Sequence, residues 1–216
     1  MESKKYGVER LRTDNMYNLH KIPKYRISND KWEFPKILCD NTIPEKLIGF
    51  NYLNSTSKNK KAGIHFYLDD YQFERIWRRP EDYINRLSEF ECILSPDFSL
   101  YMDMPYSMKV WNTYRSRWVG AYYQDKGLKV IPTISWGGSD TFDFAFSGIP
   151  QHSIVSISTV GIIRNKKTRE LWKSGVDELI KNIQPKTILI YGKEVEYNFQ
   201  DIQVKYYPNE NSERWH

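Results

Sequence analysis

Short apolar segments alternate with amphipathic segments along most of the chain. Runs rich in β-branched and aromatic residues have the length of buried strands, and segments with apolar residues at helical spacing lie between several of them. The predicted strands cover residues 47–53, 63–68, 92–95, 128–136, 153–158, 186–191 and 201–207. The predicted helices cover 80–90, 107–124 and a segment that begins at an N-cap, Thr168, and ends at Pro185. This alternation is typical of an α/β fold, and we expect a mostly parallel sheet of six or seven strands with crossover helices, either an open sheet or an incomplete barrel.

The first 46 residues lack this alternation. They contain three prolines and no clear period, so we expect residues 1–46 to form an irregular arm that wraps the domain. Residues 47–207 are predicted to form a single α/β domain, with residues 208–216 as a tail, and the polar segment 54–61 to form an exposed, mobile loop. Four apolar side chains are expected to hold the arm in place: Trp32, Phe34, Ile37 and Leu38.

The composition is that of a globular protein without disulfides or a membrane span. Of the 216 residues, 40% are hydrophobic and 27% charged, which supplies enough apolar material for a core. Cys39 and Cys92 form no C-x-x-C pair, so neither a disulfide framework nor a cysteine zinc site is supported. There is no signal-peptide pattern and no apolar run of membrane-spanning length, so we expect a cytoplasmic protein with no membrane partner. P-loop, G-x-G-x-x-G, G-x-S-x-G and histidine zinc-binding motifs are absent as well.

Positive charge is concentrated at the beginning of the chain. Residues 1–61 hold 13 basic and 7 acidic residues, a balance of +6, whereas residues 62–216 hold 19 and 20, a balance of −1. Such basic patches attract nucleic-acid phosphates or an acidic protein surface, and a merely solvated surface is the alternative. Two clusters are candidates for nucleic-acid binding, the second of them interleaved with aromatic residues. They are Lys58, Lys60 and Lys61, and Arg75, Arg78 and Arg79.

Polar and acidic residues follow several predicted strands. In parallel α/β folds ligands bind at the carboxyl ends of the strands, so these residues are expected to share one rim. Asp97, Asp140 and Asp143 are the predicted catalytic carboxylates, either holding Mg²⁺ or acting as an acid and base pair. The alternative is a structural role for these side chains. Asp97 would cap a turn, Asp140 would cap a short helix, and Asp143 would lie in the first turns of that helix. Four rim residues are predicted to bind substrate: Trp136, Ser139, Thr159 and Lys193.

Several segments in the second half of the chain resemble a family of bacterial and phage proteins known as domain of unknown function 4417. They are SPDFSLYMDMP (95–105), WNTYRSRWVGAYYQDKGLKVIPTISW (111–136), FDFAFSGIP (142–150), SIVSISTVG (153–161) and LIYGK (189–193). The resemblance covers roughly residues 45–207 and implies phage or mobile-element biology, but it supplies no catalytic assignment. Its motif positions include Asp97, Trp136 and Thr159, and they add Arg115 to the substrate-binding candidates.

Three functional hypotheses follow. The first is a phage or mobile-element protein that engages nucleic acid through its basic arm and loop, with Mg²⁺-dependent phosphodiester hydrolysis at the acidic rim. The second is a non-catalytic protein that inhibits or recruits an acidic host protein, such as a defence or replication factor. The third is a nucleotide or sugar hydrolase in which Trp136 stacks on a ring while Asp97 and Asp140 act as acid and base, which requires a closed pocket lined by all three.

Overall fold

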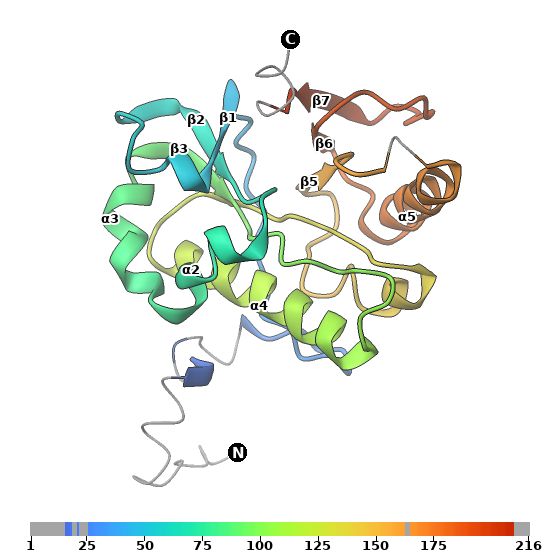
Figure 1. Cartoon of the computed structure of the whole chain (residues 1–216), viewed down its shortest axis with the longest axis horizontal. Helices are drawn as coiled ribbons and strands as arrows, with labels where there is room; N and C mark the ends of the chain where they lie inside the picture. The colour runs from blue at the N-terminus through green and yellow to red at the C-terminus, as the bar shows by residue number, and fades with distance from the viewer. Residues whose placement is uncertain (1–15, 19–20, 22–25, 163–164, 210–216) are drawn as a thin grey trace, which may run out of the picture.

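The strands that the structure describes pair in parallel, and within each sheet they follow one another in chain order. The computed structural model describes residues 16–18, 21, 26–162 and 165–209 (Figure 1). Its strands are β1 (Lys46–Gly49), β2 (Asn59–His65), β3 (Phe90–Leu94), β4 (Val130–Ile131), β5 (Ile154–Ser158), β6 (Thr187–Tyr191) and β7 (Gln203–Tyr207). They form a four-stranded sheet, β1-β2-β3-β4, and a three-stranded sheet, β5-β6-β7. The predicted α/β class with parallel strands is therefore confirmed.

A short stretch of backbone pairing joins the two sheets. A parallel bridge joins Thr133, just after β4, to Ser156 of β5. The Ile134 N–H donates to the Ser156 carbonyl, and the Ser156 N–H donates to the Pro132 carbonyl, both at 2.8 Å. Pro132 has no N–H to offer a neighbouring strand, which explains why β4 stops after two residues although the apolar pattern predicts a strand over 128–136.

Side chains from both sheets share one apolar interior. The Tyr207 hydroxyl of β7 donates to the carbonyl of Pro44, just before β1, at 2.7 Å, so the last strand is tied to the segment that leads into the first. One face of the strands packs together in a cluster made of Leu47, Tyr67, Cys92, Leu94, Ile131, Ile154, Leu189, Tyr191 and Tyr207. Alternate strand residues point to opposite faces, so the other face of each sheet is left to pack against helices.

Two long helices cover the sheets. Helix α4 (Tyr106–Asp125) packs with the β1–β4 sheet, and α5 (Lys166–Ile183) lies beside β5 and β6 (Figure 1). Arg117 of α4 is buried, and its guanidinium donates to the carbonyls of Thr133, Ala145 and Ser147 at 2.9, 2.6 and 3.1 Å. This side chain joins α4 to the segments on both sides of the sheet junction. Short helical elements fill the connections: η3 (Phe50–Tyr52), η4 (Asp70–Gln72), α2 (Arg75–Arg78), η5 (Pro80–Tyr83), α3 (Ile84–Leu87) and η6 (Ser139–Asp143).

Several predicted boundaries are wrong. Residues 59–61 belong to β2 rather than to a mobile loop, because Asn59 is paired with Phe90 of β3. The predicted helix 80–90 is a 3₁₀ turn followed by one α-helical turn, since β3 already begins at Phe90. The N-cap of α5 is Asn165, whose side chain accepts from the Lys167 N–H at 2.8 Å, and not Thr168.

The arm residues that the structure describes lie partly in the core. Phe34 and Ile37 are buried as expected, whereas Leu38 is 52% exposed, so its predicted anchoring role is wrong. Ile37 packs closely against Gly120 of α4, which leaves no room there for a larger residue. None of the described helices has the length and apolar character needed to span a membrane.

Candidate functional site

A cavity of about 630 Å³ opens where the parallel strands end. Its lining comes from the segments that follow β2, β3 and β4, from the end of β5 and the residues after it, from one face of α5 near its beginning, and from Asn209 after β7. We call it the strand-end cavity. A volume of several hundred Å³ is typical of sites for small organic ligands. The rim expected from the strand ends therefore borders a cavity of the size typical of small-ligand sites.

Asp97 is an acidic group on the lining of the strand-end cavity. Its carboxylate accepts a hydrogen bond from the Ser135 hydroxyl. Burial is the main cause that raises the pKa of Asp97 to about 6; the hydrogen bond from Ser135 acts in the opposite direction, and the negative charge of Asp70 acts in the same direction as burial. Tyr67 lies on the same lining, with its hydroxyl 2.6 Å from the Ser156 hydroxyl. A carboxyl group that exchanges its proton near neutral pH has the property required of a general acid or base.

Two indole rings belong to the same cavity lining. Trp172 of α5 is almost fully buried, and its ring N–H donates to the Ser158 carbonyl at 2.9 Å. Trp136 packs on Gly175 of α5, where any Cβ would overlap the indole. Gly175 therefore allows the helix to come close enough to support Trp136 in the cavity wall.

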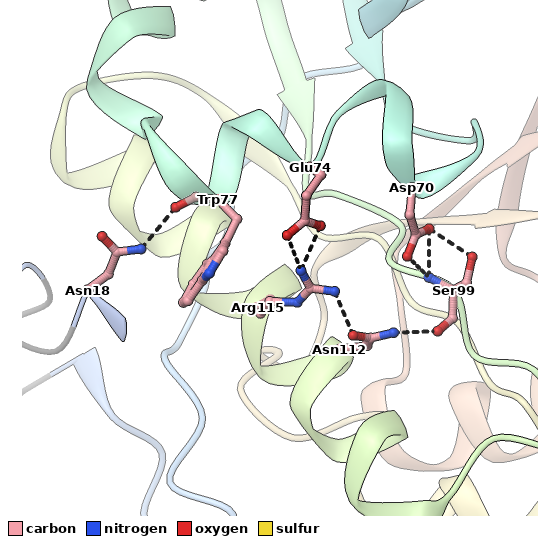
Figure 2. A network of polar contacts seen from close by, with 7 residues as sticks. All are labelled: Asn18, Asp70, Glu74, Trp77, Ser99, Asn112 and Arg115. Atoms are coloured by element: carbon pink, nitrogen blue, oxygen red, sulfur yellow. Dashed lines mark hydrogen bonds and ion pairs between the residues drawn. The ribbon is translucent and has the colours of Figure 1, made fainter. Parts of the chain in front are cut away.

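The loop that carries Asp97 is held by a polar network (Figure 2). The backbone N–H and hydroxyl of Ser99 donate to Asp70 at 3.1 and 2.8 Å. The Asn112 amide donates to the Ser99 carbonyl at 2.7 Å and accepts from Arg115 at 2.7 Å. Arg115 also donates from one nitrogen to both oxygens of Glu74, at 2.8 and 3.0 Å. Arg115 is outside the cavity lining, so the structure assigns it to the support of the loop rather than to substrate contact.

The other two predicted catalytic carboxylates lie away from Asp97. Asp140 pairs with Lys109 at 3.0 Å, and Asp143 pairs with Lys31 at 2.8 Å. Neither lines the cavity. Within the described ranges, no three His, Cys, Asp or Glu side chains are grouped closely enough to hold a metal ion. The prediction that Asp97, Asp140 and Asp143 meet at one point is therefore wrong, and these residues do not fit a Mg²⁺ site.

A different carboxylate, Asp69, shares the cavity with Asp97. It follows β2 at the same sheet edge, which is a sequence signal of the same kind as the one that selected Asp97. Asp140 instead helps to close the rim, because Lys109 donates both to it and to the carbonyl of Met102 at 3.1 Å. The third predicted group, Asp143, also accepts from the Tyr106 hydroxyl at 3.4 Å.

The remaining predicted substrate contacts are outside the lining. Ser139 is exposed in η6, and Lys193 is exposed after β6. Thr159 is buried, and its hydroxyl donates to the Lys193 carbonyl at 2.8 Å, which ties the end of β5 to the end of β6. Gly192, with φ of 121°, passes so close to the Thr159 hydroxyl that a Cβ would overlap it. Of the predicted substrate-binding residues, Trp136 alone lines the cavity.

The first basic cluster lies at the opposite edge of the sheet. Lys60 and Lys61 are in the first residues of β2, whereas the cavity opens beyond its last residue. Lys61 pairs with Glu45 at 3.1 Å, and Lys60 donates to the Ser88 carbonyl. The neighbouring Lys58 is exposed.

The second basic cluster is at α2 and just after it. The guanidinium of Arg75 lies over the Phe50 ring, 5.2 Å from its centre, and Arg78 and Arg79 are exposed. None of the three lines the strand-end cavity. The basic candidates and the cavity are therefore separate features of the molecule.

A family model described as Domain of unknown function (DUF4417) matches residues 26–208. The chain belongs to this family. The Gene 1 protein of Mycobacterium phage L5 is 42% identical to the DUF4417 chain over 185 residues, which are 84% of this chain and 80% of the phage protein. The Gene 1 protein of Mycobacterium phage D29 is 41% identical over 168 residues, which are 77% of this DUF4417 chain and 62% of that protein. No solved structure matches the chain.

The family resemblance read from the sequence segments is thus confirmed. Both relatives are phage proteins, which supports the expectation of phage biology for this DUF4417 chain.

Proposed function

We propose that the protein binds a small cyclic polar molecule, of the nucleoside or sugar class, in the strand-end cavity and hydrolyses its glycosidic bond. The observation that carries this proposal is the placement of Asp97, with a pKa of about 6, in a cavity whose wall contains Trp136. Aromatic rings pack on the faces of sugars and bases, and a carboxyl group with a raised pKa supplies the proton that a poor leaving group needs.

The chemistry requires an acid and a base on the two sides of the scissile bond. Protonated Asp97 gives its proton to the leaving nitrogen or oxygen as the bond to the anomeric carbon breaks. Water forms the new bond to that carbon, and the Asp69 carboxylate of the same cavity accepts the proton that water loses. Exchange of protons with solvent then returns both groups to their starting states.

This assignment differs from the hydrolase hypothesis drawn from the sequence in one residue. Asp69 takes the place of Asp140, because Asp140 pairs with Lys109 outside the cavity lining. It also needs no metal ion, in keeping with the scattered positions of Asp97, Asp140 and Asp143.

Hydrolysis of a panel of nucleosides and nitrophenyl glycosides tests the proposal. We expect release of free base or nitrophenol, and we expect the rate to fall as the pH rises above about 6, because Asp97 then loses its proton. Asp97→Asn should lower the rate at least about 100-fold. Asp82→Asn, at an exposed position in η5, is the matched control. If Asp97→Asn retains the full rate, or if no member of either class binds or reacts, the proposal fails.

Nucleic-acid binding is a second and separate proposal. Lys58, Arg78 and Arg79 are exposed, and none of them is in an ion pair with any residue that the structure describes. Neutralising them together should weaken binding to single- and double-stranded DNA and flatten its salt dependence. If the unaltered protein binds neither at low salt, an acidic host protein surface becomes the preferred partner for these residues.

A further inference from the structure

The charged side chains that the structure describes on the lining of the strand-end cavity all have the same sign. Its described lining includes Asp69 and Asp97 and no Lys, Arg or His. The other polar groups of the lining are neutral: the amides of Gln72 and Asn209, the hydroxyls of four Ser and Thr residues, and two Tyr hydroxyls. Every charged side chain that the structure describes on this lining is therefore negative.

The basic residues near the lining that the structure describes do not alter this balance. Lys109 lies behind the rim, with its ammonium already bound to Asp140 and to the Met102 carbonyl. Lys166 and Lys167 begin α5 but are exposed and outside the lining. Arg115 is paired with Glu74.

We infer that the ligand of the strand-end cavity is unphosphorylated, a neutral or cationic nucleoside or sugar rather than a nucleotide, a sugar phosphate or a nucleic-acid strand. This inference rests on the proposed function and narrows its substrate class. A phosphate group would be brought against a lining whose described charged side chains are Asp69 and Asp97, with no described basic side chain to offset its charge, and like charges repel. Hydroxyl and amino groups of a neutral ligand instead donate to the same carboxylates.

Asp69 is the residue at which this selection is best tested. It is exposed, it precedes η4 in an extended conformation, and its side chain makes no capping hydrogen bond. Its replacement therefore removes no capping hydrogen bond of η4. Asp69→Lys reverses one of the two lining charges while leaving Asp97 unchanged.

Calorimetric titration of the full chain with matched pairs is the experiment. The pairs are nucleosides with their 5′-monophosphates, and glucose and glucosamine with their 6-phosphates. In the unaltered protein the phosphorylated member of a pair should bind at least about tenfold more weakly. Asp69→Lys should reduce that discrimination at least about tenfold, whereas the control Asp82→Lys should leave it unchanged.

The outcomes separate the inference from the proposed function. If the phosphorylated member binds as tightly as its partner, or if Asp69→Lys leaves the ratio unaltered, the charge inference is overturned while the small-molecule site stands. If no member of any pair binds, the proposed function itself falls and the inference falls with it.

Discussion

Ionisation of Asp97 should destabilise the folded protein, and its removal should therefore stabilise it. The pKa of Asp97 is raised from 3.8 to about 6 by burial. A shift of about two units corresponds to up to about 3 kcal/mol, at about 1.4 kcal/mol per unit. Solvent in the cavity screens part of this cost, so we expect Asp97→Asn to increase the free energy of unfolding at pH 7 by about 1 to 3 kcal/mol.

The sign of the pH dependence follows from the direction of the shift. The folded state holds the proton of Asp97 more tightly than the unfolded state does, so this contribution to stability is complete below pH 4. It is lost as the pH rises through about 6. Asparagine has no such titration and can still accept a hydrogen bond from Ser135. The gain from Asp97→Asn should accordingly be near zero at pH 4 and reach its full size by pH 7.

Urea unfolding followed by tryptophan fluorescence, at half-unit steps from pH 4 to pH 8, measures this difference. Comparing the two proteins at each pH cancels the contributions of all other carboxyl groups. Asp82→Asn serves as the control, with a difference that should stay small and flat. A destabilising effect of Asp97→Asn at pH 7, or a stabilisation of the same size at every pH, would refute the reasoning.

Three further outcomes are expected. Arg117→Met should lower the free energy of unfolding by about 3 kcal/mol, measured by urea unfolding, because it removes the donor to two buried carbonyls and one partly buried carbonyl. Arg115→Met should lower the free energy of unfolding by about 2 kcal/mol and speed amide hydrogen exchange in the loop after β3, because the Arg115 network holds that loop. Unchanged exchange in the loop would contradict the positioning role of Arg115. Gly175→Ala favours helix by about 1 kcal/mol but overlaps Trp136, so ligand affinity measured by calorimetry should fall even if α5 remains intact.

The elements that the sequence predicts best are those decided by local periodicity. Helix α4 and strands β5 and β6 match their predicted ranges within one residue at each end, because a continuous apolar pattern and clear stop signals define them. The helix predicted over 80–90 ends early, because strand pairing outweighs the local helix propensity there. Phe90 and the residues after it pair with β2 on one side and with β4 on the other, which ends the helix early.

The candidate site, too, could be predicted from the sequence only in part. Asp97, Trp136 and the cavity edge could be inferred from strand ends, because parallel strands deliver their carboxyl ends to one edge whatever the details of packing. The pairing of Asp140 with Lys109 could not, since Lys109 is 31 residues away on another helix. The same holds for Arg115, whose partner Glu74 lies 41 residues away.

The sequence by itself determined that this is an α/β protein with parallel strands, which family it belongs to, and which edge of the sheet carries polar side chains. These properties follow from periodicity and from the order of residues along the chain. Only the tertiary structure decided which of those side chains share a space. Which charged groups pair depends on their distances and burial in three dimensions. Asp140 and Asp143 therefore form ion pairs with lysines, whereas Asp69 lies on the cavity lining with Asp97.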